Sequence, residues 1–264
     1  MDVQNAFLHG DLEEEVYIKM PPGFASQSPG KQSYSDYSLF TFRARTIQLN
    51  VLIYMDDLIV SSNDVSAVQK FKNYLIRCFH MKDLGKMKFF LGIEVARNSN
   101  GIFLCQRKYA LDVISEVGLL GCKPAKTPLE QNHKLALTES DDVDDSAQYR
   151  RLVGQLIYLT ITRPELSYCV HILAQFMQQL KKDHWETAVR VVHYLKGNPG
   201  QGMLLHANCD LKLSTYCDSD WASCPLTRRS LTCYFVLLGD SPISWKTKKQ
   251  QTVSRSSAKL NIAL

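Results

Sequence analysis

The stretch VLIYMDDLIV, residues 51–60, constrains the fold of this chain more than any other part of the sequence. It places two neighbouring carboxylates, Asp56 and Asp57, between two runs of strand-forming apolar residues. Successive residues of a strand point to opposite faces of a sheet, so a straight strand cannot direct both aspartates to one site. A hairpin with Tyr54–Asp57 in its tight turn removes this conflict. The stretch therefore predicts an antiparallel hairpin with an acidic tip.

The chemistry of this acidic tip has two explanations. Neighbouring carboxylates raise each other's pKa unless a cation neutralises them, and oxygen ligands of this kind suit Mg²⁺ or Mn²⁺. In a two-metal site, ions roughly 3.5–4 Å apart stabilise the attacking and leaving oxygens of phosphoryl transfer. Aspartate is also a common turn residue, and a hairpin with two of them needs no metal. Taken alone, the stretch favours this second explanation.

The composition is that of a soluble globular protein of one large domain or two ordinary ones. The chain has 264 residues, of which 45% are hydrophobic and 22% charged. No apolar run is long enough to span a membrane, and the mixed, acidic start resembles neither a secretory signal nor a transit peptide. Eight cysteines without a C-x-x-C pair indicate free thiols in a reducing compartment. We therefore expect an intracellular protein, in the cytoplasm or the nucleus, that is neither secreted nor membrane-bound.

The apolar patterning predicts a mixed α+β fold. A helix is expected to begin after Asn63-Asp64, with Val65, Val68, Phe71, Leu75 and Phe79 repeating at helical spacing. A hairpin is expected around NSNG, where Asn100-Gly101 supplies positive φ angles. The other expected elements are strands at 37–43, 51–55, 58–61 and from 203 onward, and helices at 108–124, 149–160, 165–181 and 184–196.

Several long motifs follow one another along the chain, and together they identify a family. They are MDVQNAFLHGDLEEEVYIKMPPGF, SDYSLF, IYMDDLIVSSND, MKDLGKMKFFLGIEV, GIFLCQRKYALDVI, YRRLVGQLIYLTITRPELSYCV, HWETAVRVVHYLKG and YCDSDWAS. In this order they closely resemble the reverse transcriptase of copia-type retrotransposons, followed by the start of a ribonuclease H domain. The resemblance covers nearly the whole chain.

The resemblance implies the domain organisation. Residues 1–122 correspond to an incomplete polymerase palm, an antiparallel sheet plus helices, which includes the primer-grip hairpin. Residues 123–148, polar and Pro-bearing, form a linker. Residues 149–202 correspond to a helical thumb and connection, and residues 203–264 to a partial, truncated ribonuclease H-like sheet.

The resemblance also implies the site residues and the partners. The metal-binding, catalytic carboxylates are Asp2, Asp56 and Asp57, with Mg²⁺ or Mn²⁺ as the cofactor. The partners are an RNA template, a DNA primer or hybrid, and deoxynucleotides, whose α-phosphate the primer 3′-hydroxyl attacks. The remaining assignments are Phe7, Tyr54 and Met55 to nucleotide binding, Leu91 and Gly92 to the primer grip, and Asp218 to the first metal carboxylate of the ribonuclease H remnant.

The chain departs from the family pattern in three places. Asp2 directly follows Met1, so we expect its metal ligand to lie on a frayed chain end. Between PPGF and SDYSLF, a family stretch of the type CKLxKSLYGLKQxPRxW is replaced by ASQSPGKQSY, which removes one wall of the nucleotide site. The family's SSAEAEY reads SSAKLNIAL, with Lys259 and Asn261 at the acidic positions. Lysine in its charged form has no lone pair for a metal, and a neutral amide is a poor Mg²⁺ ligand. We expect no hydrolysis and little or no polymerisation.

Two other functions remain open from the sequence. The basic stretch 244–259, with Trp245 among lysines, suits a non-catalytic nucleic-acid-binding remnant with salt-dependent affinity. Alternatively, the missing palm segment leaves strand edges exposed, and the chain is an unstable product of a decayed element.

Overall fold

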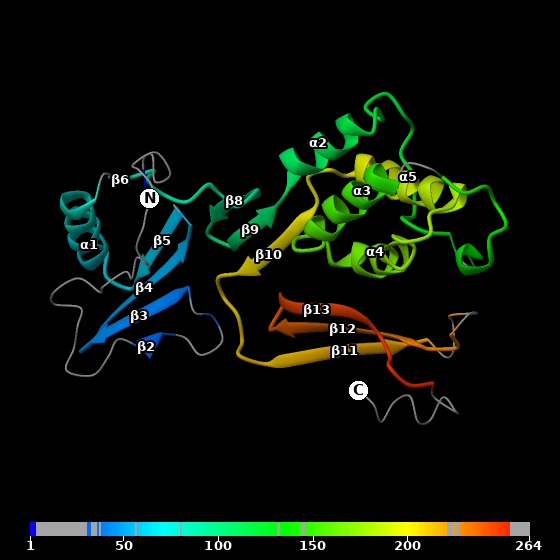
Figure 1. Ribbon diagram of the computed structural model, residues 1–264. Coiled ribbons are helices and arrows are strands. Elements are labelled where there is room, and N and C mark those ends of the chain that lie inside the picture. The colour runs from blue at the N-terminus through cyan, green and yellow to red at the C-terminus, as the bar shows by residue number, and fades with distance from the viewer. Residues whose placement is uncertain are drawn as a thin grey trace, which may run out of the picture. The chain divides into compact units, whose positions relative to one another are not determined.

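The computed structural model describes residues 1–3, 31–32, 36, 38–55, 57–79, 81–130, 133–143, 146–220, 224 and 227–253. The chain divides into two compact units, a first unit at Met1–Met87 and a second unit at Lys88–Leu264. Each combines helices with antiparallel sheet (Figure 1), which confirms the expected α+β class.

Among its described residues, the first unit contains a six-stranded antiparallel sheet covered by helix α1 (Figure 1). The strand order is β2-β3-β4-β5-β1-β6. Two alternate residues of β4, Leu49 and Val51, are buried and pack against Phe71 and Leu75 of α1. The elements are β1 (Asp2–Val3), β2 (Lys31–Gln32), β3 (Leu39–Ala44), β4 (Ile47–Tyr54), β5 (Asp57–Ser62), α1 (Val65–Cys78) and β6 (Met81–Lys82).

Helix α1 begins where the sequence predicts it. The Asp64 carboxylate accepts a hydrogen bond of 2.8 Å from the Ser66 amide, which satisfies a backbone donor that the first turn leaves unpaired. The predicted apolar repeat is confirmed at Phe71 and Leu75. It is wrong at its ends, because Val65 is 85% exposed and Phe79 lies beyond the last helical residue.

The second unit begins with a four-stranded sheet of order β10-β9-β8-β7. Its strands are β7 (Phe89–Phe90), β8 (Ile93–Asn98), β9 (Gly101–Cys105) and β10 (Gly202–His206). The hairpin predicted at NSNG is confirmed, and the Asn98 side chain accepts from the amides of Asn100 and Gly101. Of the predicted pair, Gly101 alone has a positive φ. A Cβ there would lie 2.0 Å from the Leu205 carbonyl oxygen, so β10 can approach only a glycine.

Four helices form the main core of the second unit (Figure 1). They are α2 (Arg107–Glu116), α3 (Ser146–Leu159), α4 (Ser167–Ala174) and α5 (Lys182–Gly197), with short 3₁₀ turns at Leu135–Leu137 and Pro164–Leu166. Their apolar stripes meet in residues that are almost fully buried, among them Val113, Ile114, Val153, Leu156, Leu173, Val191 and Leu195. The helices predicted from the 3.6-residue periodicity are therefore confirmed, with α2 and α4 shorter than expected.

Residues 123–148, expected to be a linker, run along this helical core where they are described. The Ala125 amide donates to the His193 carbonyl of α5 at 3.1 Å, and Leu135 is buried. Arg190 pairs with Glu130 at 2.8 Å. The segment is polar overall, but these contacts fasten it to α5.

The chain continues into a three-stranded antiparallel sheet of β11 (Leu213–Ser219), β12 (Leu231–Leu238) and β13 (Ser241–Lys249). Trp245 of β13 donates its indole N–H to the Thr160 carbonyl oxygen at 2.8 Å, and Lys249 donates to Gln175. These bonds fix β13 to the region of α3 and α4. No helix within the described ranges is long and apolar enough to cross a membrane.

Candidate metal and primer site

The acidic hairpin has the geometry that the sequence predicts. Tyr54 pairs with Asp57, so only two residues connect β4 to β5. Met55 in this connection has a φ of 51° and is 75% exposed. Left-handed residues are what a two-residue hairpin turn requires. Asp56 and Phe7 lie outside the described residues.

Strand β1 brings Asp2 to the acidic hairpin. In the antiparallel pairing of β1 with β5, Asp2 lies directly opposite Asp57. Directly opposite positions share one face of an antiparallel sheet. The register thus assembles two carboxylate-bearing positions that are far apart in sequence.

The expectation of a frayed end at Asp2 is wrong. Strand β1 lies between β5 and β6, not at an edge of the sheet. Met1 and Leu58 exchange two backbone hydrogen bonds of 2.9 Å, and Met1 packs against the core of the first unit. Asp2 is therefore held by ladder partners on both sides.

A lysine completes the row of positions across these strands. Lys82 of β6 lies directly opposite Asp2, which lies opposite Asp57. Lys82 is exposed. The sequence singled out the carboxylates but not this lysine, because only the β1–β6 pairing brings it beside them.

The donor chemistry of the carboxylate row fits a divalent cation. Carboxylate oxygens are the preferred protein ligands of Mg²⁺ and Mn²⁺, and the register sets the positions of Asp2 and Asp57 opposite each other. Within the described part of the chain, no three His, Cys, Asp or Glu side chains gather closely enough to hold a metal ion. Tyr54 is 48% exposed beside this row, so its side chain is accessible to a ligand.

The predicted primer-grip residues form a second tight turn, in the second unit. Phe90 pairs with Ile93, so Leu91 and Gly92 alone connect β7 to β8. Their φ angles are 47° and 74°. The hairpin was not predicted from the apolar pattern, because leucine seldom adopts a left-handed conformation.

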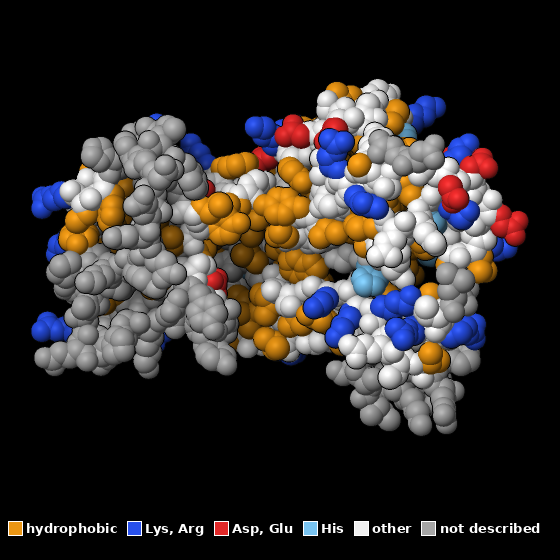
Figure 2. All heavy atoms as spheres, in the orientation of Figure 1, with side chains coloured by type: hydrophobic (Ala, Val, Ile, Leu, Met, Phe, Trp, Pro, Cys, Tyr) orange, Lys and Arg blue, Asp and Glu red, His pale blue; other side chains and the backbone are white. Residues whose placement is uncertain are grey.

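Asp218, predicted as a ribonuclease H carboxylate, is exposed on β11. It lies opposite Cys233 of β12, and its carboxylate accepts a hydrogen bond from the Ser219 amide. Lys259 and Asn261 lie outside the described residues. Figure 2 shows Lys and Arg side chains gathered over the region of this sheet, where Arg228, Arg229, Lys246 and Lys248 are exposed.

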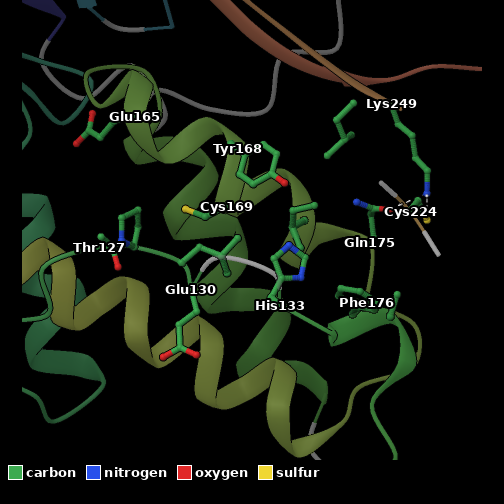
Figure 3. Close-up of a pocket in the computed structure, with 15 residues that line it drawn as sticks. Thr127, Glu130, His133, Glu165, Tyr168, Cys169, Gln175, Phe176, Cys224 and Lys249 are labelled. Atoms are coloured by element: carbon green, nitrogen blue, oxygen red, sulfur yellow. Dashed lines mark hydrogen bonds between the residues drawn. The ribbon is translucent and has the colours of Figure 1, made fainter. Parts of the chain in front are cut away.

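A cavity of about 760 Å³ in the second unit was not predicted (Figure 3). It is lined by α4, by residues from 127–136 and by β12 and β13. At its wall, the Lys249 ammonium donates to the Cys224 sulfur at 3.2 Å. Burial alone would raise the pKa of this thiol, but hydrogen bonds from Thr227 and Lys249 outweigh it and lower the pKa to about 7. The lining contains both the Lys249 ammonium and the carboxylates of Glu130 and Glu165, so its charges do not favour either an anionic or a cationic ligand.

Comparison with known proteins identifies the family. A family model described as "Reverse transcriptase (RNA-dependent DNA polymerase)" matches residues 37–131. The retrovirus-related Pol polyprotein from transposon RE2 of Arabidopsis thaliana is 36% identical over 290 aligned positions, which cover 97% of this chain and 20% of that polyprotein. The Pol polyprotein from transposon TNT 1-94 of Nicotiana tabacum is 30% identical, covering 97% of this chain and 22% of the polyprotein.

A shorter relative matches over most of its own length. An uncharacterized mitochondrial protein of Arabidopsis thaliana is 40% identical over 209 positions, which cover 78% of this chain and 86% of that protein. No solved structure matches. The chain spans about a fifth of the length of the RE2 polyprotein. With the reverse transcriptase model matching around the acidic hairpin and transposon polyproteins aligning along nearly the whole sequence, the chain belongs to the copia-type retrotransposon reverse transcriptases and is a reverse transcriptase region of a Pol polyprotein.

Proposed function

We propose that this chain carries the metal-binding and primer-holding parts of an RNA-directed DNA polymerase. The observation that carries the proposal is the register of β1 with β5, which sets Asp2 opposite Asp57 beside the two-residue turn. In this proposal the sheet of the first unit is the polymerase palm, and α3 is the thumb helix along the duplex. The three strands β11–β13 are the start of a ribonuclease H fold.

The carboxylates Asp2, Asp56 and Asp57 are the proposed ligands for divalent cations. Two Mg²⁺ ions bound there would supply charge stabilisation for the attacking and leaving oxygens of nucleotidyl transfer. The exposed side chains of Tyr54 and Met55, at the hairpin tip, contact the incoming nucleotide. Phe7 packs beneath its sugar, where its ring excludes a 2′-hydroxyl.

The substrates are those of the family: an RNA template, a DNA primer and deoxynucleotides. The turn of Leu91 and Gly92 holds the primer 3′ end, whose hydroxyl attacks the α-phosphate of the nucleotide. Ribonuclease H cleavage is absent in this proposal, because Lys259 and Asn261 stand where Asp218 needs acidic partners.

DNA synthesis by this chain is at or near background in the proposal, because one wall of the nucleotide site is missing. The family stretch between PPGF and SDYSLF has no counterpart here. In support, the alignment with the RE2 polyprotein extends over 290 positions, more than the 264 residues of this chain, so that relative carries residues that this chain lacks.

Two assays on one preparation test the proposal. Fluorescence anisotropy should show binding of an RNA–DNA primer–template, with an affinity that falls as salt rises because phosphate contacts dominate. Primer extension with Mg²⁺ on the same protein should give little product. Absence of hybrid binding at low salt would contradict the primer-holding role. Robust synthesis that disappears in Asp57→Asn but persists in Asp112→Asn, an exposed carboxylate of α2, would contradict the loss of activity.

A further inference from the structure

The turn of Leu91 and Gly92 adopts a conformation that its own sequence does not favour. Both residues are left-handed, with φ angles of 47° and 74°. A two-residue turn of this kind matches the twist of a hairpin, but the left-handed conformation is strained for a leucine in it. Strands β7 and β8 pair at only two positions, Phe89↔Glu94 and Phe90↔Ile93. The short ladder therefore needs support from outside the hairpin.

Helix α3 supplies this support through Tyr158. The Tyr158 hydroxyl donates a hydrogen bond to the Leu91 carbonyl oxygen, which the turn itself leaves without a partner in the ladder. The ring lies against the second turn residue, because a Cβ at Gly92 would be 3.3 Å from the Tyr158 Cε1 atom. Glycine at this position thus meets two requirements, the positive φ and the close approach of the tyrosine.

Helix α2 fixes Tyr158 from its other side. The rings of Tyr109 and Tyr158 meet edge to face, with centroids 5.2 Å apart and an interplanar angle of 79°. This is a preferred geometry for two aromatic rings. The two helices are joined further by the Gln155 side chain, which donates to Glu116 at 2.6 Å.

The hairpin has a second attachment to the helices. The Glu94 carboxylate of β8 accepts a hydrogen bond of 2.7 Å from the Lys108 amide. Lys108 lies in the first turn of α2, where amide groups have no partner inside the helix and the helix dipole favours a negative charge. The strand is therefore held at α2 and the turn at α3.

We propose that Tyr158 is a positioning residue that fixes the Leu91–Gly92 turn on helix α3, and that it thereby sets the place of the primer 3′ end. The second half rests on the proposed function, in which this turn holds the primer. Tyr158 acts through the turn and not on the reacting atoms. The hydrogen bond from its hydroxyl fixes the direction of the Leu91 carbonyl. The contact of its ring with Gly92 sets the distance between the turn and helix α3.

The first experiment measures the turn itself and needs no catalytic activity. Hydrogen exchange of the amides from 91 to 93, followed by mass spectrometry or NMR, is compared between wild type and Tyr158→Phe. We expect roughly five- to tenfold faster exchange, the effect of losing one hydrogen bond. The matched control is Tyr149→Phe, because Tyr149 lies on the same helix and donates a similar bond to the Leu173 carbonyl at 2.8 Å.

The control should lower global stability without a selective change at the turn. Unchanged exchange at 91–93 in Tyr158→Phe and also in Tyr158→Ala would overturn the positioning role. Equal acceleration at the turn in Tyr149→Phe would overturn it as well, because the effect would then be general.

The second experiment reads the primer end. A 2-aminopurine at the primer 3′ terminus reports local stacking, while anisotropy of the same duplex reports overall affinity. We expect Tyr158→Phe to change the terminal fluorescence and to leave the affinity nearly unchanged, with Tyr149→Phe changing neither. If Tyr158→Phe speeds exchange at the turn but leaves the 2-aminopurine fluorescence unchanged, the role of Tyr158 in setting the primer end is overturned, while its role in fixing the turn stands. Failure of the wild type to bind the duplex would refute the proposed function, while the exchange result would still decide the positioning of the turn.

Discussion

At the scale of single residues, the Cys224 thiol has a cation in hydrogen-bond contact with it. Lys249 donates to its sulfur at 3.2 Å, and the pKa of Cys224 is lowered to about 7 against the opposing effect of burial. Cys169 in the same cavity wall shows the opposite case, because burial raises the pKa of its thiol to about 12. The thiolate is the reactive form of cysteine.

This contrast predicts selective alkylation. Cys224 should react with iodoacetamide with a pH midpoint of about 7, and its reaction should slow as the pH falls below that value. Cys169 should stay unmodified throughout. Lys249→Met should move the midpoint up, towards the roughly 8.5 of an ordinary thiol. Peptide mapping by mass spectrometry measures alkylation at each cysteine. An alkylation midpoint of Cys224 that stays the same in Lys249→Met would contradict the contact between Lys249 and Cys224.

Some residues of the candidate site could be predicted from the local sequence, and others could not. The pair at 56–57 predicts an acidic hairpin tip, because two adjacent charges among apolar residues are compatible with few local structures. The partner positions Asp2 and Lys82 enter through strand pairing between distant segments. Tyr158 likewise reaches Leu91 from another element. Local patterns carry no signal for such contacts. Asp2 was therefore assigned from the family resemblance, and Lys82 and Tyr158 were missed.

At the scale of elements, replacing two glycines by alanine should change the stability of the fold in opposite directions, one in a helix and one in a sheet. Gly154 lies exposed inside α3, with nothing within 4 Å of a Cβ added there, so Gly154→Ala should stabilise the fold by about 0.5–1 kcal/mol. Gly101→Ala forces its Cβ to 2.0 Å from the Leu205 oxygen and should destabilise it by roughly 2–4 kcal/mol. Urea unfolding measures both, and a neutral Gly101→Ala would contradict the β9–β10 pairing.

The buried His184 of helix α5 should make the stability of the fold depend on pH. Burial lowers the pKa of His184, whose ring accepts from the Lys181 amide and contacts the Leu135 carbonyl at 3.0 Å. Below pH about 6.5, the unfolded state therefore binds the proton more readily than the folded state, and stability falls as the pH falls. The melting temperature of the wild type should drop more steeply between pH 7 and pH 5 than that of His184→Gln. Parallel curves would contradict the neutral, buried histidine.

The elements were predictable where one segment fixes its own structure. Helix α1 has its cap and apolar stripe in sequence, and the NSNG turn has its glycine. The β7–β8 hairpin was expected from the family resemblance and not from the apolar pattern, because its turn depends on a tyrosine from another helix. The pairing of β10 with β9 was missed for a similar reason, since helices α2, α3, α4 and α5 separate the two strands in sequence.

At the scale of the whole chain, the sequence motifs identified the family. The structure adds a division into two compact units between Met87 and Lys88. The carboxylate row lies in the first unit, whereas the turn of Leu91 and Gly92 lies with the helices of the second. The predicted domain boundaries at 122, 148 and 202 stay predictions about function. The contacts nevertheless show that the predicted primer grip is attached to α2 and α3 through Glu94 and Tyr158.

The proposed cation site at Asp2 and Asp57 depends on the register in which β1 pairs with β5. A titration of the protein with Mn²⁺, followed by electron paramagnetic resonance, measures whether these carboxylates bind a cation. Asp57→Asn should weaken Mn²⁺ binding by at least roughly tenfold, the loss that even an outer-sphere partner can cause. Asp112→Asn should bind as the wild type does. Equal Mn²⁺ affinity in the wild type and Asp57→Asn would contradict the proposed site.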